Sequence, residues 1–317
     1  MDLAEQVEAV LRMQQFIEKH INEPITLHML AGEAKYSPWH SARIFKELTG
    51  KAPFEYIRMV RLSKAALKLR DEKNKIVDVA LDFVFDSHEG FTRAFSKEFG
   101  ITPKHYCREK PPIKLFIPFS IRDYYLARMN LNKSSAGIME EKGVDRMMDK
   151  EGKQTGKTVF VQVIERPARK LILKRGIKAE EYWTYCEEVG CDVWGILTSV
   201  KEAIYEPAGM WLPENLCIPG TSKYIQGVEV SCNYMGKMPE GFDLIELNPC
   251  KMMVFQGQPY EEEKMNEAIR EVWDAIEGYN PELYGFKWAP GDAPRFQLAP
   301  MGYRGYIEAR PVRPVNE

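Results

Sequence analysis

Apolar residues in the first 108 positions recur at helical spacing and predict a series of short helices. The first helix carries five of them on one face: Leu3, Val7, Val10, Ile17 and Ile21. Residues that favour helix starts or ends follow along the chain, namely Thr26, Ser37 with Pro38, Gly50, Ser87 and Gly100. A longer amphipathic helix begins at Pro53 and reaches Leu69, with basic side chains on its polar face. This part of the chain is therefore expected to be all-α.

Two segments predict helix-turn-helix units, in which the second helix enters the major groove of DNA while the first crosses the backbone. One unit spans residues 26–34, a turn at 35–37 and a second helix from Pro38; the other spans 76–84, a turn near 85–86 and a second helix from His88 to Phe99. In each second helix the apolar residues face the core, namely Ile44, Phe45 and Leu48, and Phe91, Phe95 and Phe99. The residues left facing outward are Trp39, His40, Arg43 and Lys46 in the first unit, and His88, Glu89, Thr92, Arg93 and Ser96 in the second.

The composition changes between residues 109 and 157, from a Pro-rich start to a polar tail without periodicity, which is typical of a linker. From Thr158 strands alternate with helices, and the pattern repeats at an offset of 81 residues: Lys170–Leu173 matches Lys251–Val254, and Pro219 matches Pro300. We therefore expect a multidomain chain, with an all-α N-terminal domain (1–108), a linker (109–157) and an α+β C-terminal domain (158–317). The last is expected to contain a duplicated strand-strand-helix-strand-strand unit, packed as one sheet or as two facing half-sheets, with a groove along its pseudo-twofold axis.

Composition adds limits to this picture. The chain has 317 residues, 44% of them hydrophobic, yet its apolar runs are far shorter than the ~20 residues needed to cross a bilayer. The N-terminus carries acids where a signal peptide carries bases, so a cytoplasmic protein without a membrane partner is expected. The six cysteines are irregularly spaced, so neither a disulfide framework nor a metal site is expected, and no cofactor is predicted.

Charge is distributed unevenly around the net value of −2. Residues 1–110 hold 18 lysines and arginines against 16 acids, whereas residues 37–75 alone hold ten bases against four acids. A solvated helix face explains such a run, and so does a surface that binds a polyanion. Because arginine can bind guanine through two hydrogen bonds, Arg43 and Arg93 are candidates for reading bases. Arg61 and Lys64 of the long helix are further candidates for DNA contact.

The run LAGEAKYSPWHSARIFKELTGKAPFEYIRMVRLSKAALKL, with FTRAFSKEFGITPKHY further on, resembles the DNA-binding domain of AraC/XylS-type transcription regulators over residues 8–108. The resemblance implies double-stranded DNA and RNA polymerase as partners. It also implies six groove-facing positions: Trp39, His40, Arg43, His88, Glu89 and Arg93. Val84 stands where the family usually has glycine, so we expect the second turn to be reshaped.

The segments ERPARKLILKRG, YIQGVEVS and APRFQLAPMGYRGYIEARPV resemble the GyrI-like effector-binding domain over residues 158–313. The resemblance implies a concave pocket for a small, often cationic or aromatic, molecule. Aromatic faces attract cations, and a carboxylate beside them would pair with a cationic ligand. Tryptophans also serve as ordinary packing, which is the competing explanation for each of them. The candidate pocket residues are Trp183, Trp211, Tyr224, Glu229, Trp273, Tyr284, Tyr306 and Glu308.

Together these features predict a bacterial transcription regulator that senses a small-molecule effector and is not an enzyme. The main alternative is a GyrI-like hydrolase fused to a DNA-binding domain, with a glutamate and a tyrosine as a general-base pair. A third possibility is a domain that serves only as a protein-contact surface. A Ser-His-Asp triad is excluded in the second domain because no histidine follows His105, and no phosphate-binding glycine loop is found.

Overall fold

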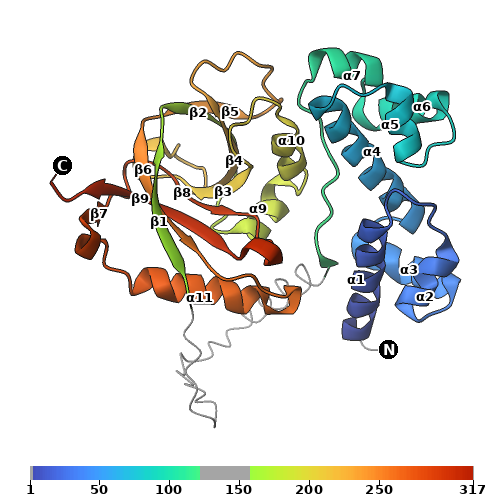
Figure 1. Ribbon diagram of the computed structural model, residues 1–317, viewed down its shortest axis with the longest axis horizontal. Coiled ribbons are helices and arrows are strands. Elements are labelled where there is room, and N and C mark those ends of the chain that lie inside the picture. The colour runs from blue at the N-terminus through green and yellow to red at the C-terminus, as the bar shows by residue number, and fades with distance from the viewer. Residues whose placement is uncertain (1–2, 122–157, 317) are drawn as a thin grey trace, which may run out of the picture. The chain divides into compact units, whose positions relative to one another are not determined.

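The computed structural model describes residues 3–121 and 158–316, which fall into two compact units, one of helices and one built on a sheet (Figure 1). The part of the expected linker at 122–157 lies outside the described residues. The helical unit contains α1 (Leu3–Lys19), α2 (Leu27–Ala34), α3 (Pro38–Thr49), α4 (Pro53–Asp71), α5 (Ile76–Asp82), α6 (His88–Phe99) and α7 (Pro103–Glu109).

The helix limits confirm the capping signals of the sequence. The Ser37 hydroxyl accepts a hydrogen bond from the His40 amide at the start of α3, and the Ser87 hydroxyl accepts one from the Gly90 amide at the start of α6. Gly50 and Gly100 end these helices with φ of 73° and 68°, the left-handed conformation that glycine adopts without steric cost. The second helices of the two helix-turn-helix units therefore begin at a capping serine and end at a left-handed glycine in the same way.

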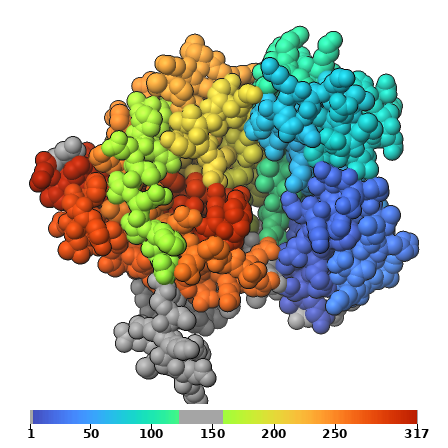
Figure 2. Space-filling model, in the orientation of Figure 1, coloured from blue at the N-terminus to red at the C-terminus, as the bar shows by residue number. Residues whose placement is uncertain are grey.

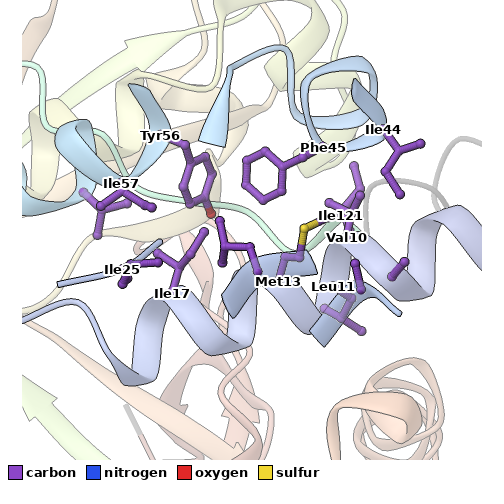
Figure 3. Close-up of a cluster of buried hydrophobic side chains, with 14 of the residues drawn as sticks. Val10, Leu11, Met13, Ile17, Ile25, Ile44, Phe45, Tyr56, Ile57 and Ile121 are labelled. Atoms are coloured by element: carbon purple, nitrogen blue, oxygen red, sulfur yellow. The ribbon is translucent and has the colours of Figure 1, made fainter. Parts of the chain in front are cut away.

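The helical unit has two lobes that share α4, and Figure 2 shows them as separate blue and cyan bodies. The core of the first lobe joins α1, α2 and α3 to the first part of α4, and Figure 3 shows Phe45, Tyr56 and Met13 at its centre. The core of the second lobe joins the remainder of α4 to α5, α6 and α7 through residues such as Leu69 and Phe95. Because one continuous helix contributes to both cores, the lobes are fixed at opposite ends of α4.

Residues 110–121, which the sequence assigns to the linker, pack against both lobes, and we call them the strap (Figure 1). Its residues 111–120 form neither helix nor strand. Ile113 and Leu115 lie in the second core, and Ile121 lies in the first. The Ser63 hydroxyl accepts a hydrogen bond of 2.7 Å from the Phe116 amide. The buried side chain of Gln14 accepts one from the Ile121 amide at 3.1 Å and donates one to the Phe119 carbonyl at 3.0 Å. The ordered domain thus extends at least twelve residues beyond α7.

The second turn keeps the shape of the first, so the expected reshaping at Val84 is not found. Val84 has φ of 61° and Lys35, at the matching place in the first turn, has φ of 60°. The Phe85 amide donates to the Ala80 carbonyl at 3.0 Å, as the Tyr36 amide donates to the Ala31 carbonyl at 3.3 Å. A left-handed conformation is unfavourable for a β-branched residue, so Val84 retains the turn at a cost in stability.

Val84→Gly is expected to stabilise the helical unit. Glycine has no Cβ and avoids the steric cost of the left-handed conformation, which raises the free energy of unfolding by about 1–2 kcal/mol. The greater freedom of glycine in the unfolded chain offsets about 0.4–1 kcal/mol of this gain. The urea midpoint of the full chain, followed by its helical circular dichroism, should therefore rise. Lys35→Gly is the matched control and should give a smaller gain, because lysine is not β-branched. A lowered midpoint for Val84→Gly would contradict the strain at this position.

Within residues 158–316 the sheet unit contains nine strands, with helices on one face of the sheet. The strands are β1 (Phe160–Arg166), β2 (Arg169–Arg175), β3 (Ala208–Trp211), β4 (Tyr224–Ser231), β5 (Asp243–Leu247), β6 (Cys250–Gln256), β7 (Phe286–Trp288), β8 (Arg295–Leu298) and β9 (Ile307–Pro314). The helices are α9 (Tyr182–Val189), α10 (Val193–Ser199) and α11 (Met265–Glu277), with short 3₁₀ turns η1 (Glu214–Leu216), η2 (Glu262–Lys264), η3 (Pro281–Tyr284) and η4 (Gly302–Arg304). All strand pairs are antiparallel, in the order β1-β6-β9-β8-β3-β4-β2-β5, with β7 beside β9.

Alternation along the strands separates two faces of the sheet. Leu171, Met210 and Phe296 belong to a core on one face, which we call the inner face. On the other, the helix face, α9 and α10 pack on β4, and α11 packs on β6. Strands β3 and β8 lie between these two helical covers in the strand order. Neither described range contains a helix with the length and apolar character of a membrane span.

Candidate DNA-binding surface and ligand groove

Helices α3 and α6, the recognition helices, turn their polar residues outward as the sequence predicts. Ile44, Phe45, Phe91 and Phe95 are fully buried in the two cores. The expected outward residues are exposed at Trp39, Arg43, Lys46, His88, Glu89 and Arg93, and half-buried at His40, Thr92 and Ser96. Both helices thus carry an exposed arginine six residues after the capping serine.

Polar contacts organise the exposed face of α3. Trp39 is 75% exposed, and the Arg43 guanidinium lies 5.7 Å from the centre of its ring. The guanidinium is also 3.3 Å from Nδ1 of His40 and 3.5 Å from a carboxylate oxygen of Glu47. These contacts are between exposed groups and hold the side chain weakly, so a guanine edge can replace them. Arg43 is therefore available for base recognition.

The two candidate residues on α4 are engaged with the first lobe. Arg61 donates to the carbonyl of Ile21 at 2.9 Å and to that of Glu23 at 2.5 Å, and burial lowers its pKa. Lys64 forms an ion pair of 3.0 Å with Glu18. These bonds fasten the end of α1 to α4. DNA contact by Arg61 and Lys64 stays a prediction.

In the sheet unit, the middle of the helix face, between the two helical covers, carries rows of polar and aromatic side chains. The strand register places Gln226, Gly209, Gln297 and Glu308 next to one another across β4, β3, β8 and β9. A second row, two residues along, places Tyr224 beside Trp211 and Trp211 beside Arg295. Since α9 and α10 cover one side and α11 the other, these rows lie where the groove expected from the sequence would have its floor, and we call them the floor.

The carboxylate of Glu308 is the most heavily bonded group of this floor and is 1% exposed. Arg310 donates to it at 3.0 Å, Trp273 of α11 donates at 3.0 Å, and Arg295 lies 3.9 Å away. The Tyr306 hydroxyl is 3.4 Å from the same carboxylate and donates to Gln297 at 2.7 Å. Burial raises the pKa of Tyr306 and lowers that of Arg295. Glu308 is therefore neutralised by arginines of its own sheet.

Tyr224 and Trp211 form the aromatic part of the floor. Their rings meet edge to face at 5.0 Å, and the Trp211 indole donates to the Glu180 carbonyl at 2.9 Å. A Cβ on Gly209 would lie 2.4 Å from the Tyr224 hydroxyl, so a glycine is needed for Tyr224 to lie across β3. In the part of the chain that the structure describes, the Tyr224 hydroxyl and both amide atoms of Gln226 are buried without a hydrogen-bond partner. Such groups are typical of sites that bind water or a ligand.

Glu229 lies apart from the other candidate residues. It alternates with Tyr224 along β4 and so projects to the inner face. There its carboxylate is 3% exposed and pairs with Arg166 at 2.5 Å and with Arg169 at 2.9 Å. The geometry therefore does not support Glu229 as a pocket residue, because its side chain lies on the opposite face of the sheet from the floor.

The remaining candidates differ in position. Trp273 reaches the floor through its bond to Glu308, whereas Trp183 lies on α9, with its ring against Tyr182 at 4.9 Å. Tyr284 in η3 is 64% exposed and stacks on Tyr279, outside the floor. Sequence reasoning missed four floor residues: Gln226, Gln297, Arg295 and Arg310. Alternation from Glu308 could have found Arg310, two residues further along the same strand.

Two lobes, each with a capped and exposed recognition helix, define a helix-turn-helix DNA-binding protein. Residues 30–109 match a family model described as a helix-turn-helix domain. Over 92 residues the chain is 37% identical to the regulatory protein SoxS of Salmonella typhimurium, covering 29% of this chain and 86% of SoxS. The chain belongs to the AraC family of transcription regulators, as the sequence resemblance predicts.

Two further relatives show how far the likeness extends. The right origin-binding protein of Escherichia coli K12 is 44% identical over 108 residues, which are 32% of this chain and 37% of that protein. The uncharacterized HTH-type transcriptional regulator YbfP of Bacillus subtilis is 31% identical over 178 residues, which are 55% of this chain and 58% of YbfP. The chain thus spans little more than a third of the first of these relatives.

Proposed function

We propose that the protein is a transcription regulator in which α3 and α6 enter successive major grooves of one DNA duplex and the sheet unit binds a small effector. The presence of Arg43 and Arg93 at matching, exposed places on the two recognition helices carries this proposal. Trp39, His40, Lys46, His88, Glu89 and Thr92 are the other proposed contacts. RNA polymerase is a further proposed partner, in keeping with a family of transcription regulators.

The length of α4 supports a two-groove mode of binding. Its 19 residues span about 28 Å at the rise of an α-helix, close to the roughly 34 Å between successive turns of DNA. The lobes sit at the two ends of this helix, and the strap packs against both. The recognition helices are thus held on a spacer of suitable length.

Replacing Arg43 or Arg93 with alanine tests the DNA-binding role. A site is first selected from random duplexes with the full chain, and binding is measured by gel shift at one salt concentration. Each variant is expected to lose about 1–3 kcal/mol, roughly 5- to 150-fold in affinity, with relaxed preference at a few base pairs. Lys19→Ala, an exposed lysine of α1, controls for loss of one charge. Unchanged affinity in both arginine variants would overturn the proposal.

We also propose that the sheet unit arose by duplication, as its sequence repeat predicts. Strands β2 and β6 are offset by 81 residues at both ends. The strand order is symmetric about its centre if β1 corresponds to β5, β2 to β6, β3 to β8 and β4 to β9. Exchanging each strand with its counterpart gives the same order read from the other end. This symmetry places β3 and β8 at the centre, where the groove floor lies. A binding site on the pseudo-twofold axis supports an effector-sensing role.

Sensing, rather than turnover, is the role that the groove supports. A general base needs a carboxylate free to take a proton, whereas Glu308 is paired with Arg310 and contacted by Trp273. The neighbouring Tyr306 has a raised pKa and is a poor proton donor near neutral pH. Regulation then requires that the effector bind differently to the DNA-competent state and to the other state of the protein.

A further inference from the structure

A hollow of about 750 Å³ opens at the end of the groove floor where Trp211 and Arg295 lie. Its walls come from the chain around Trp211–Asn215, from Trp288 and the loop after it, and from β8 and β9. The volume suits a ligand of a few rings, since small-molecule sites commonly occupy about 300–1,000 Å³. The hollow therefore offers a defined site for part of the proposed effector.

The basic side chains of the hollow outnumber the carboxylates that neutralise them. Arg295, Arg310 and Lys223 line it. Glu214 pairs with Lys223 at 3.5 Å, and the buried Glu308 is shared between Arg295 and Arg310. One positive charge thus remains, and it belongs to the two arginines. This arrangement works against the cationic ligand expected from the sequence.

Arg295 is the arginine that lacks an acceptor. Its guanidinium lies 4.0 Å from the centre of the Trp211 ring, and its ion pair with Glu308 is long, at 3.9 Å. Within residues 3–121 and 158–316, Nε of Arg295 is buried without a hydrogen-bond partner. A guanidinium has five N–H donors in a planar fork that matches a carboxylate. Its surroundings therefore hold the group in place but leave its buried Nε–H donor without an acceptor.

We propose that this hollow binds a small aromatic carboxylate, with the carboxylate between Arg295 and Arg310 and the ring against Trp211. The inference rests on the proposed sensing role of the sheet unit and names the ligand class. Trp211 is fixed by its bond to the Glu180 carbonyl and by Tyr224, so it forms a preformed aromatic wall. Trp288 provides aromatic surface elsewhere in the same hollow. The anion neutralises the remaining charge of the arginine pair.

Calorimetric titration of the full chain with three matched probes tests the proposal: naphthoate, neutral naphthamide and cationic naphthylmethylammonium. Naphthoate should bind at least about tenfold more tightly than either other probe, because only it neutralises the arginines. Its affinity should fall by about tenfold or more in Arg295→Gln and stay unchanged in Lys237→Gln, which removes an exposed charge elsewhere in the same unit. The melting temperature of each variant shows that it is folded.

Equal binding of naphthoate and naphthamide would overturn the proposal, as would preference for the cation or failure of all three probes to bind. These comparisons use the unmodified chain, so they hold even if Arg295→Gln does not fold. They also need no DNA. Preference for the cation would leave the sensing role in place, and loss of DNA binding in the gel shift would leave the carboxylate site in place. Failure of the inference and failure of the proposed function are therefore distinguishable.

Discussion

Leu115→Ala and Ile121→Ala are each expected to lower the stability of the helical unit by about 2–5 kcal/mol, although both residues follow α7. Leu115 is 2% exposed in the core of the second lobe, and Ile121 is 1% exposed in the core of the first. Each truncation leaves a cavity among residues that belong to other helices. The measurement is urea unfolding of the full chain, followed by helical circular dichroism.

Ile117→Ala is the matched control, because Ile117 belongs to the same strap but is 37% exposed. It should cost well under half as much as either core variant, since little apolar surface is lost. Equal effects of all three substitutions would show that the strap does not pack as described. Hydrogen exchange adds a second readout: Leu115→Ala should first expose amides of α5 and α6, and Ile121→Ala those of α1 and α3.

The strap also bears on DNA binding. Because it packs against both lobes, it restricts how far the recognition helices can move relative to α4. Leu115→Ala should therefore weaken binding to a selected two-groove site even though it removes no DNA contact. The loss should fall on all sequences alike, in contrast to the altered base preference expected for Arg43→Ala.

Local signals in the sequence predicted much of the helical unit. Ser37, Ser87, Gly50 and Gly100 act on their own helix ends, so their effect is readable without knowledge of the fold. The strap has no comparable signal. Ile113 and Leu115 stand in a segment without helix, strand or periodicity, and the sequence does not show that both side chains enter the core of the second lobe. Val84 shows the opposite case, in which the tertiary fold imposes a conformation that its residue type disfavours.

The candidate ligand site was harder to predict than the helical unit. A strand that is buried on both faces shows no alternation of apolar and polar residues, so the face that each side chain occupies cannot be assigned. Seven of the eight residues of β4 are buried, so the sequence does not show which face Glu229 or Gln226 occupies. The face that each residue occupies follows from how the strands pair. Such pairings join residues far apart in the sequence, for example Leu171 with Glu229, which are more than fifty positions apart. The aromatic and acidic residue types were sound candidates. The partners of Glu308, Arg295 and Arg310, could be identified only from the pairing of the strands in the structure.

Glu229→Gln is expected to destabilise the sheet unit by about 3–5 kcal/mol, because it leaves two arginines buried without a counter-charge. The side chains of Arg166 and Arg169 are 8% and 2% exposed, and Glu229 is the carboxylate that pairs with both. The Arg166 guanidinium also lies 3.6 Å from the centre of the Tyr205 ring and 4.8 Å from that of Phe296. Thermal unfolding of the full chain, followed by tryptophan fluorescence, measures the loss.

Glu165→Gln is the control for this pair, since Glu165 is 78% exposed and its ion pair with Lys251 joins neighbouring strands at the surface. It should cost far less stability than Glu229→Gln, because solvent screens an exposed ion pair. A triple variant with Glu229→Leu, Arg166→Met and Arg169→Met should recover much of the stability that Glu229→Gln loses, because no buried charge is then unpaired. A triple variant less stable than Glu229→Gln would mean that the arginines stabilise the inner face through packing and cation–π contacts rather than through their pairing with Glu229.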